Sequence, residues 1–112
     1  MPLLGLCRIP IVQGRGNITI DIYFLDGRNM IAEQLYHTVG HELEHAHHAA
    51  SGDYYEWVEQ WGEAAAGYYS EYLAYKWNVD HLHIASYPGA RRHYEGGVNY
   101  YAQKYLEARG AF

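Results

Sequence analysis

The feature that most constrains this chain is the motif H-E-L-E-H at residues 41–45, which lies inside a segment with helical periodicity. Apolar residues recur at every third or fourth position from Leu35 to Ala46, which predicts a helix with one apolar side. Residues four apart on a helix share a face, so His41 and His45 are expected to point the same way.

Two imidazole groups one helical turn apart can both reach a single metal ion. Zinc accepts such ligands at about 2.0–2.1 Å. Glu42 follows His41 directly, where its carboxylate can reach a water on the metal rather than the metal itself. The motif therefore predicts a zinc site with His41 and His45 as ligands and Glu42 as general base. The alternative interpretation is a solvated, histidine-rich helix face without a metal.

The composition narrows the class of protein. The 112 residues predict a single domain over 1–112. A formal net charge of −5 argues against nucleic acid as the main partner. Only Cys7 is available, so no internal disulfide can form. No apolar run approaches the ~20 residues of a membrane span, and the first residues lack the basic region of a signal peptide.

The first half of the chain predicts a short strand followed by the motif helix. Residues 1–16 contain two prolines and three glycines and are expected to be irregular, or to form a short strand around 7–12. Residues 17–25 alternate between apolar and polar side chains, which predicts a half-buried strand. The motif helix is expected over about 30–50, ended by Gly52 in the left-handed conformation.

The second half predicts two more helices. One begins at Asp53 and runs to about Trp77, with Gly62 as a candidate break. Residues 78–92 contain Pro88-Gly89 and are expected to form a connection. A last helix is expected over about 98–109. We also note that His37 and His48 extend the stripe of His41 and His45, either as supporting groups or as surface residues.

A catalytic zinc site normally has three protein ligands, and the second helix offers Glu56, Glu59, Glu63 and Glu71 as the third. If the two helices form a tight antiparallel pair about residue 53, His45 lies about 12 Å back along the axis. Glu63 then lies about 15 Å on and Glu71 about 27 Å on. This geometry favours Glu63, unless the chain breaks at Gly62 and a new helix starts there.

The motif at 41–45, followed by Glu71-Tyr-Leu-Ala74, resembles the gluzincin branch of zinc metallopeptidases, in which the glutamate of an E-x-x-A pattern completes the site. Over about residues 18–77 the chain also looks like metallopeptidase-type domains at the C-termini of bacterial Rhs and other polymorphic toxins. The resemblance implies Glu71 as the third zinc ligand, although Glu63-Ala-Ala-Ala66 fits the same pattern. It also implies an α+β, mainly helical fold: a minimal zincin-like domain with a short N-terminal strand or small sheet.

The function implied is that of a zinc metallopeptidase that hydrolyses a peptide or protein substrate, as a toxin or effector domain. Such a domain acts in the cytoplasm or after delivery into a target cell. The sequence identifies no immunity or partner protein. The alternative is a non-catalytic zinc-binding or interaction module that uses the same helix. Five side chains are candidates for stabilising the oxyanion: Tyr75, His81, His83, His93 and Tyr94.

Overall fold

The computed structural model describes the backbone of residues 3–13, 16–25 and 32–110, and the side chains of residues 32–110. Its elements are, in order, β1 (Leu3–Gln13), β2 (Gly16–Leu25), α1 (Ala32–Ala50), α2 (Asp53–Trp61), α3 (Glu63–Asp80), a 3-10 turn (Leu82–Ile84) and α4 (Ala90–Ala108). The turn expected at residues 26–29 and the first two residues expected for the motif helix lie outside the described residues.

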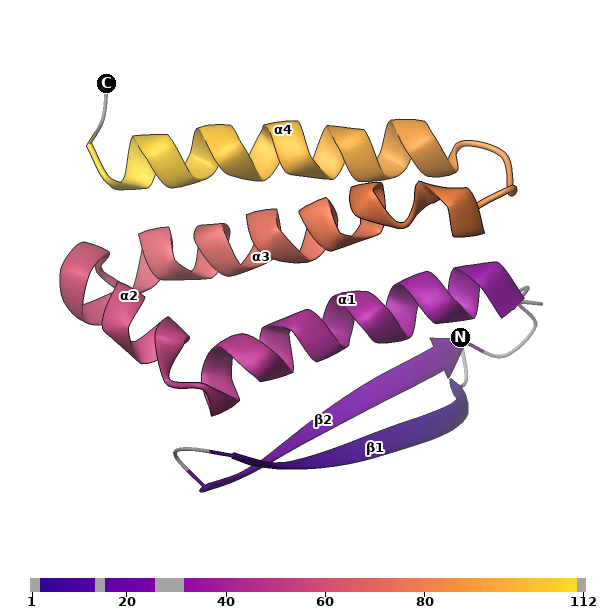
Figure 1. Ribbon diagram of the computed structural model, residues 1–112, viewed down its shortest axis with the longest axis horizontal. Helices are drawn as coiled ribbons and strands as arrows, with labels where there is room; N and C mark the ends of the chain where they lie inside the picture. The colour runs from indigo at the N-terminus through magenta and orange to yellow at the C-terminus, as the bar shows by residue number, and fades with distance from the viewer. Residues whose placement is uncertain (1–2, 14–15, 26–31, 111–112) are drawn as a thin grey trace.

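Three long helices lie side by side in the order α1, α3, α4, and each runs antiparallel to its neighbour (Figure 1). The short helix α2 closes one end of this layer and connects α1 to α3. The motif is on α1 and the candidate glutamates are on α2 and α3, so the contact between α1 and α3 decides which of these side chains meet.

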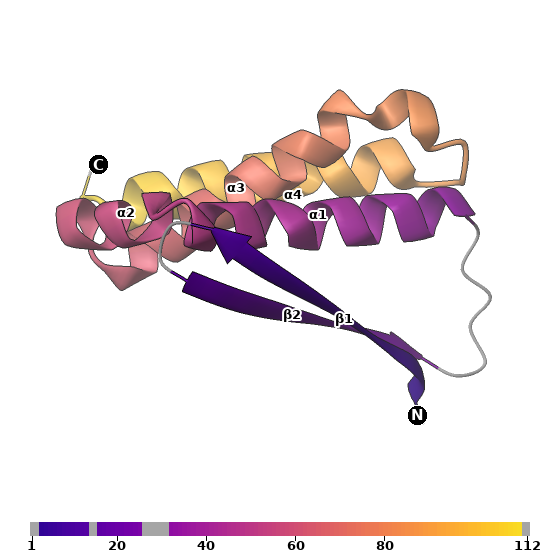
Figure 2. The same cartoon turned by 60° about the horizontal axis from the view of Figure 1, so that its bottom comes forward.

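Residues 3–25 form an antiparallel hairpin in which β1 and β2 pair with each other, from Leu3 opposite Leu25 to Gln13 opposite Gly16. The hairpin crosses beneath α1 (Figure 2), with β2 against that helix. Of the two predictions for residues 1–16, the irregular segment is wrong and the short strand is confirmed, although strand β1 (Leu3–Gln13) is longer than the residues 7–12 expected.

The predicted fold class is wrong. The expectation was an α+β, zincin-like domain with a strand or small sheet, whereas residues 32–110 form a small all-α unit of four helices that contains no strand. The physical reason is that the helices bury their inner faces against one another, and the two-stranded hairpin lies outside that core, against α1.

Two helix boundaries also differ from the prediction. The helix α3 continues to Asp80, and α4 begins at Ala90 instead of about residue 98. Gly89 takes a left-handed conformation (φ 79°), and its carbonyl accepts from the His93 N–H. The turn at Pro88-Gly89 therefore leads directly into α4. The C-terminal end of the motif helix α1 agrees with the prediction, because Gly52 is left-handed (φ 90°).

Gly62 separates α2 from α3. Its φ of 89° and ψ of 167° are open to glycine and costly for other residues, and the Gly62 N–H closes α2 on the Val58 carbonyl. Because α2 is a separate helix across the end of the layer, α3 restarts at Glu63 and runs back along α1. The tight-pair geometry that favours Glu63 therefore does not apply.

The core between the helices is made of small residues and polar groups. The buried apolar side chains are mostly alanines: Ala46, Ala50, Ala65, Ala66, Ala74, Ala90 and also Tyr94. Within residues 32–110, the largest fully buried side chains are His37 and Asn78. Buried polar groups destabilise a fold unless they are hydrogen-bonded, so their presence at the centre of so small a core points to a task other than packing.

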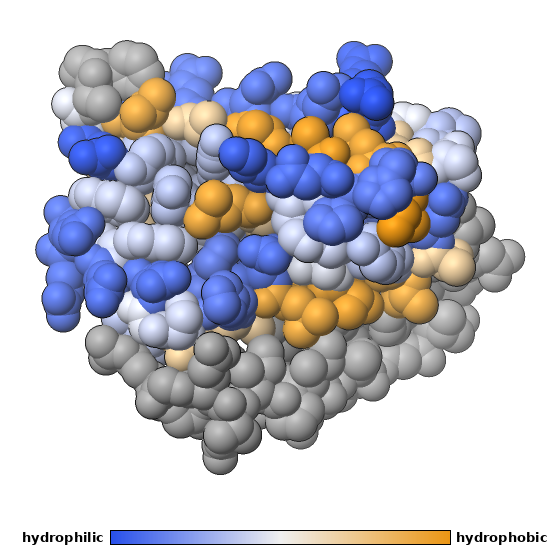
Figure 3. All heavy atoms as spheres, viewed as in Figure 1, coloured by the Kyte–Doolittle hydropathy of each residue, from blue (hydrophilic) through white to orange (hydrophobic). Residues whose placement is uncertain are grey.

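On the face shown in Figure 3, apolar side chains lie in separate groups among polar ones. None of the helices that the structure describes is both long and apolar enough to cross a membrane.

Candidate metal centre

The structure brings His41 and His45 of α1 together with Glu71 of α3. Their potential ligand atoms all lie within 4.8 Å of one another, and this group can hold a metal ion. Glu71 Oε1 is 2.7 Å from His45 Nε2, and Glu71 Oε2 is 3.6 Å from His41 Nε2. All three side chains are partly buried, and Glu71 is the most exposed of them at 33%.

Helix geometry explains why Glu71 and not Glu63 reaches the histidines. Glu71 lies eight residues into α3, about 12 Å along the axis, and His45 lies eight residues before the start of α2, also about 12 Å. With α2 closing the end of the layer, these two positions come level. Glu63, at the first position of α3, is exposed and is not part of the group.

The contact between His45 and Glu71 is close, but it does not have the geometry of a hydrogen bond. Within residues 32–110, His45 Nε2 is a buried nitrogen without a hydrogen-bond partner, even though Glu71 Oε1 lies only 2.7 Å away. A nitrogen and a carboxylate oxygen this close can both be ligands of one cation.

His41 is held from behind by Asn78 of α3. The Asn78 amide nitrogen donates to the His37 backbone carbonyl (3.2 Å) and lies 2.8 Å from His37 Nδ1. Because its nitrogen is committed to a carbonyl, the amide has one orientation, and Asn78 Oδ1 accepts from His41 Nδ1 at 2.8 Å. His41 therefore carries its proton on Nδ1, and its Nε2 presents a lone pair to the site.

The chain of hydrogen bonds behind His41 continues to the backbone. Because His37 Nδ1 accepts from Asn78, the proton of a neutral His37 is on Nε2, and that nitrogen donates to the His81 carbonyl at 3.1 Å. Every donor and acceptor in this series has a partner of the right kind. His37, which the sequence left as either a supporting or a surface residue, is fully buried and supports the site.

His45 is held from behind by Ser70 of α3, the residue before Glu71. Ser70 Oγ lies 2.7 Å from His45 Nδ1 and 2.8 Å from His48 Nδ1. His48 is buried, packs edge-on against the ring of Trp57 in α2, and has Glu44 Oε2 3.7 Å from its Nε2. The surface interpretation of His48 is therefore wrong as well.

The electrostatics of the group suit a cation. The facing His41 and His45 lower the pKa of Glu71 to about 2, so its carboxylate is ionised at neutral pH. Burial lowers the pKa of His41, but the facing Glu71 carboxylate and the Asn78 hydrogen bond outweigh burial and raise it above its usual value. Burial, with His45 and His47 nearby, lowers the pKa of His48 to about 4, so that this ring is neutral.

A cavity of about 200 Å³ opens beside the metal group, between α1, α3 and α4. The side chains that line it are His37, Thr38, His41, Glu42, Tyr75, Asn78, His93 and Tyr94. Glu42 thus shares the cavity with His41, the ligand that precedes it in the motif.

Tyr75 is an aromatic residue of this cavity whose ring contacts one of the candidate ligands. Its ring packs edge-on against His41 with ring centroids 4.6 Å apart and stacks on Tyr101 of α4. Gly97 of α4 makes room for it, since a Cβ at that position would come within 2.3 Å of the Tyr75 ring. Burial, with Glu71 nearby, raises the pKa of Tyr75, so its hydroxyl keeps its proton at neutral pH.

The cavity also divides the five oxyanion candidates. Tyr75, His93 and Tyr94 line it, whereas His81 and His83 do not. The Tyr94 hydroxyl is already hydrogen-bonded to the Tyr87 hydroxyl. His81 is stacked on Trp77 and its Nδ1 bonds the Trp77 carbonyl.

Sequence reasoning missed Ser70 and Asn78. Neither belongs to a recognisable motif, because their role depends on the register of α3 against α1. One local signal was available: Ser70, Ala74 and Asn78 recur at intervals of four, and these residues form the buried stripe of α3.

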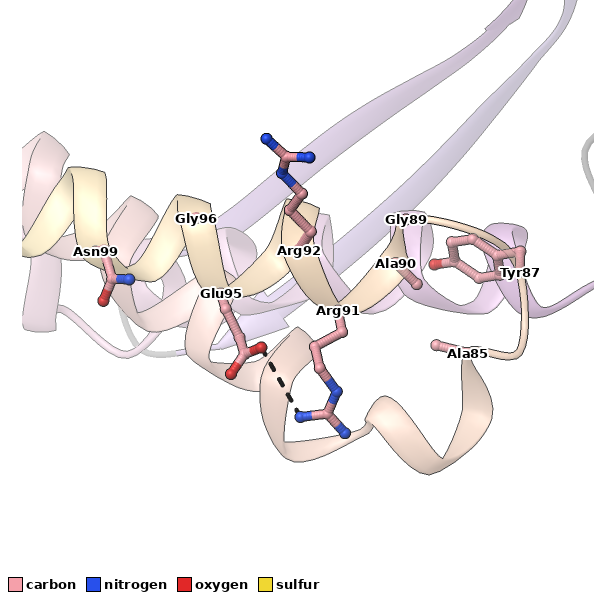
Figure 4. Close-up of a pocket in the computed structure, with 9 residues that line it drawn as sticks. All are labelled: Ala85, Tyr87, Gly89, Ala90, Arg91, Arg92, Glu95, Gly96 and Asn99. Atoms are coloured by element: carbon pink, nitrogen blue, oxygen red, sulfur yellow. Dashed lines mark ion pairs between the residues drawn. The ribbon is translucent and has the colours of Figure 1, made fainter.

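A larger hollow of about 720 Å³ lies elsewhere, at the start of α4 (Figure 4). Arg91 forms an ion pair with Glu95 at 3.8 Å, and Arg92 points away from that pair. This hollow shares no lining residue with the cavity beside the metal group, and it adds nothing to the metal centre.

No family model matches the chain, and no curated protein or solved structure is similar enough to count as a match. The likeness to gluzincins and to toxin domains therefore rests on the motif residues alone.

Proposed function

We propose that this chain is a zinc-dependent peptidase, with His41, His45 and Glu71 as zinc ligands and Glu42 as general base. The observation that carries the proposal is the meeting of two imidazole nitrogens and an ionised carboxylate at one point, beside a cavity that Glu42 lines. Ligands about 2.0–2.2 Å from a tetrahedral zinc ion lie about 3.4 Å apart, and the contacts of 2.7 and 3.6 Å bracket that spacing.

The number of ligands favours catalysis over a purely structural metal. A structural zinc site is usually closed by four protein ligands, and His37 or His48 would be the candidates for the fourth. The Nδ1 atoms of both are engaged, with Asn78 and Ser70 respectively, and neither residue belongs to the metal group. Three protein ligands leave a position for water.

When bound, zinc supplies a Lewis acid that acidifies water and polarises a carbonyl group. Glu42 takes the proton of the attacking water, whose oxygen adds to the carbonyl carbon of the peptide. The C–N bond then breaks, and Glu42 delivers the proton to the leaving amine. Of the five oxyanion candidates, Tyr75 and His93 line the cavity and are not bonded to Tyr87 as Tyr94 is, so they are the donors that can stabilise the negative charge on the carbonyl oxygen. The resemblance to toxin domains suggests an effector setting for this activity.

The test is Glu42→Gln, with exposed Glu63→Gln as the matched control. Each protein is loaded with zinc and incubated with a mixture of unstructured peptides, and new amino termini are counted by mass spectrometry. We expect Glu42→Gln to keep one zinc ion per chain and lose about 10²- to 10⁴-fold in rate, while Glu63→Gln behaves as the unaltered chain. Loss of zinc together with activity would contradict the role of Glu42 as base. A zinc-loaded chain without turnover would favour the alternative, a non-catalytic zinc-binding or interaction module.

A further inference from the structure

The Ser70 hydroxyl lies between His45 and His48 of α1, and it can hydrogen-bond both rings only by donating to one and accepting from the other. Its hydroxyl has a single proton, and Oγ lies 2.7 Å from His45 Nδ1 and 2.8 Å from His48 Nδ1. The hydroxyl must donate to one nitrogen and accept from the other. When both rings are neutral, one of the two Nδ1 atoms carries a proton and the other does not. The tautomers of His45 and His48 are therefore linked.

A metal ion on His45 Nε2 selects one of the two combinations. The proton of His45 must then be on Nδ1, where it donates to Ser70 Oγ, and the Ser70 hydroxyl donates to His48 Nδ1. The Glu44 carboxylate, 3.7 Å from His48 Nε2, favours the proton of His48 on Nε2 and so supports this combination. The opposite combination turns the lone pair of His48 toward Glu44 and places a proton on His45 Nε2, 2.7 Å from the Glu71 carboxylate, where it excludes the metal.

We propose that His48 is a positioning residue: through the Ser70 hydroxyl it holds His45 in the tautomer whose Nε2 can bind the metal. This role rests on the metal site proposed above. It also explains why a polar ring is buried against Trp57 at a place where an apolar residue would pack without the need for a partner.

His48→Leu tests the proposal, because leucine fills the space but offers no acceptor. The Ser70 hydroxyl then has only His45 Nδ1 to donate to, which leaves the proton of His45 on Nε2, where zinc must displace it. Long-range ¹H–¹⁵N correlation spectra of the zinc-loaded unaltered chain report the tautomer of His48, and we expect its proton on Nε2. Zinc affinity is measured in parallel by competition with a chelator, and we expect a 10- to 100-fold loss.

Two further variants separate positioning from packing. His48→Asn presents an amide oxygen near the place of Nδ1 and is expected to restore most of the zinc affinity. His47→Leu removes an exposed neighbouring histidine and is expected to leave the affinity unchanged. If zinc affinity is unchanged in His48→Leu, or if His48 of the zinc-loaded protein carries its proton on Nδ1, the proposal is wrong.

Ser70→Ala keeps the test decisive if His48→Leu does not fold. It removes the link with a smaller change, and the loss of zinc affinity should match that of His48→Leu and not increase in the double variant. Additive losses would contradict a shared pathway. An unaltered chain that takes up no zinc would overturn the metal site and the positioning role together, whereas equal zinc affinity in the unaltered chain and in His48→Leu would overturn the positioning role alone.

Discussion

The two histidines of the motif are supported by different kinds of group. Behind His41 stands Asn78, whose fully buried amide is tied to the backbone carbonyl of His37 and so has one orientation. Behind His45 stands the Ser70 hydroxyl, whose proton can turn toward either of two nitrogens. The helix backbone thus fixes the first ligand, whereas another side chain, His48, is needed to fix the second.

This difference shows that one motif on one helix does not give two equivalent ligands. A substitution of Asn78 is expected to destabilise the fold, because its buried amide links α1 to α3 through several hydrogen bonds. A substitution of Ser70 or His48 is expected to leave most of the packing in place and to change the tautomer of the His45 ring. We therefore expect the two sides to differ in stability, in response to pH and in metal binding.

The largest effect should come from Asn78→Ala. The change leaves His37 Nδ1 and the His41 Nδ1 proton without partners in a buried place, removes the side-chain hydrogen bond to the His37 carbonyl, and opens a cavity. We expect the free energy of unfolding of the metal-free protein to fall by about 4 kcal/mol, as measured by urea denaturation. A loss below about 1 kcal/mol would mean that water replaces the amide and that the two sides are alike.

Acidification should lower the free energy of unfolding by a smaller amount, through His48 on the Ser70 side. The pKa of His48 in the folded chain is about 4, below the ordinary value of 6.5 that applies after unfolding. The unfolded chain therefore binds more protons, and the stability due to the neutral ring is complete above pH 6.5 and is lost as the pH falls toward 4. His45, His47, Asp53 and Glu44 are the titratable groups that face it.

His48→Asn isolates this contribution. Urea denaturation of the metal-free proteins at pH 7 and at pH 4.5 should show the unaltered chain losing about 2–3 kcal/mol more than the variant over this range. Glu71 does not interfere, since its pKa of about 2 and ordinary value of 4.5 place its own contribution at lower pH. Parallel pH profiles for the two proteins would show that His48 is not held neutral by the fold.

The smallest effect on stability should come from Ser70→Ala. It leaves the Nδ1 atoms of His45 and His48 unpaired but removes only one oxygen atom and opens little space, so we expect a loss of about 1–2 kcal/mol in the free energy of unfolding. Compared with Asn78→Ala in the same urea titration, it measures the difference between the two supports. Equal losses of stability in Ser70→Ala and Asn78→Ala would show that His41 and His45 are supported to the same degree.

The motif helix and its C-terminal end could be predicted from the sequence because they depend on local pattern. Helical spacing alone brings His41 and His45 to one face, and Gly52 takes the left-handed conformation expected of it. The third ligand could not be fixed in this way. Spacing along a single tight pair favours Glu63, and only the separate helix α2, broken from α3 at Gly62, brings Glu71 level with His45.

The fold class and the supporting residues depend on contacts between distant segments. Alternation over residues 17–25 indicates a strand but not whether a sheet is built into the core, and the helical unit contains none. Ser70 and Asn78 act across 25 and 37 residues of sequence. The start of α4 was missed because Gly96 and Gly97 weaken the helical pattern, although contact with α3 keeps those residues in a helix.

The most direct test of the account is the zinc content of Glu71→Ala beside that of Glu63→Ala, by elemental analysis of proteins purified without added metal and again after zinc is supplied. Both glutamates lie on α3 and both start an E-x-x-A pattern, so each variant is the control for the other. We predict about one zinc ion per chain in the unaltered protein and in Glu63→Ala, and loss of zinc in Glu71→Ala. Zinc retained in Glu71→Ala, or absent from all three proteins after it is supplied, would contradict the metal centre.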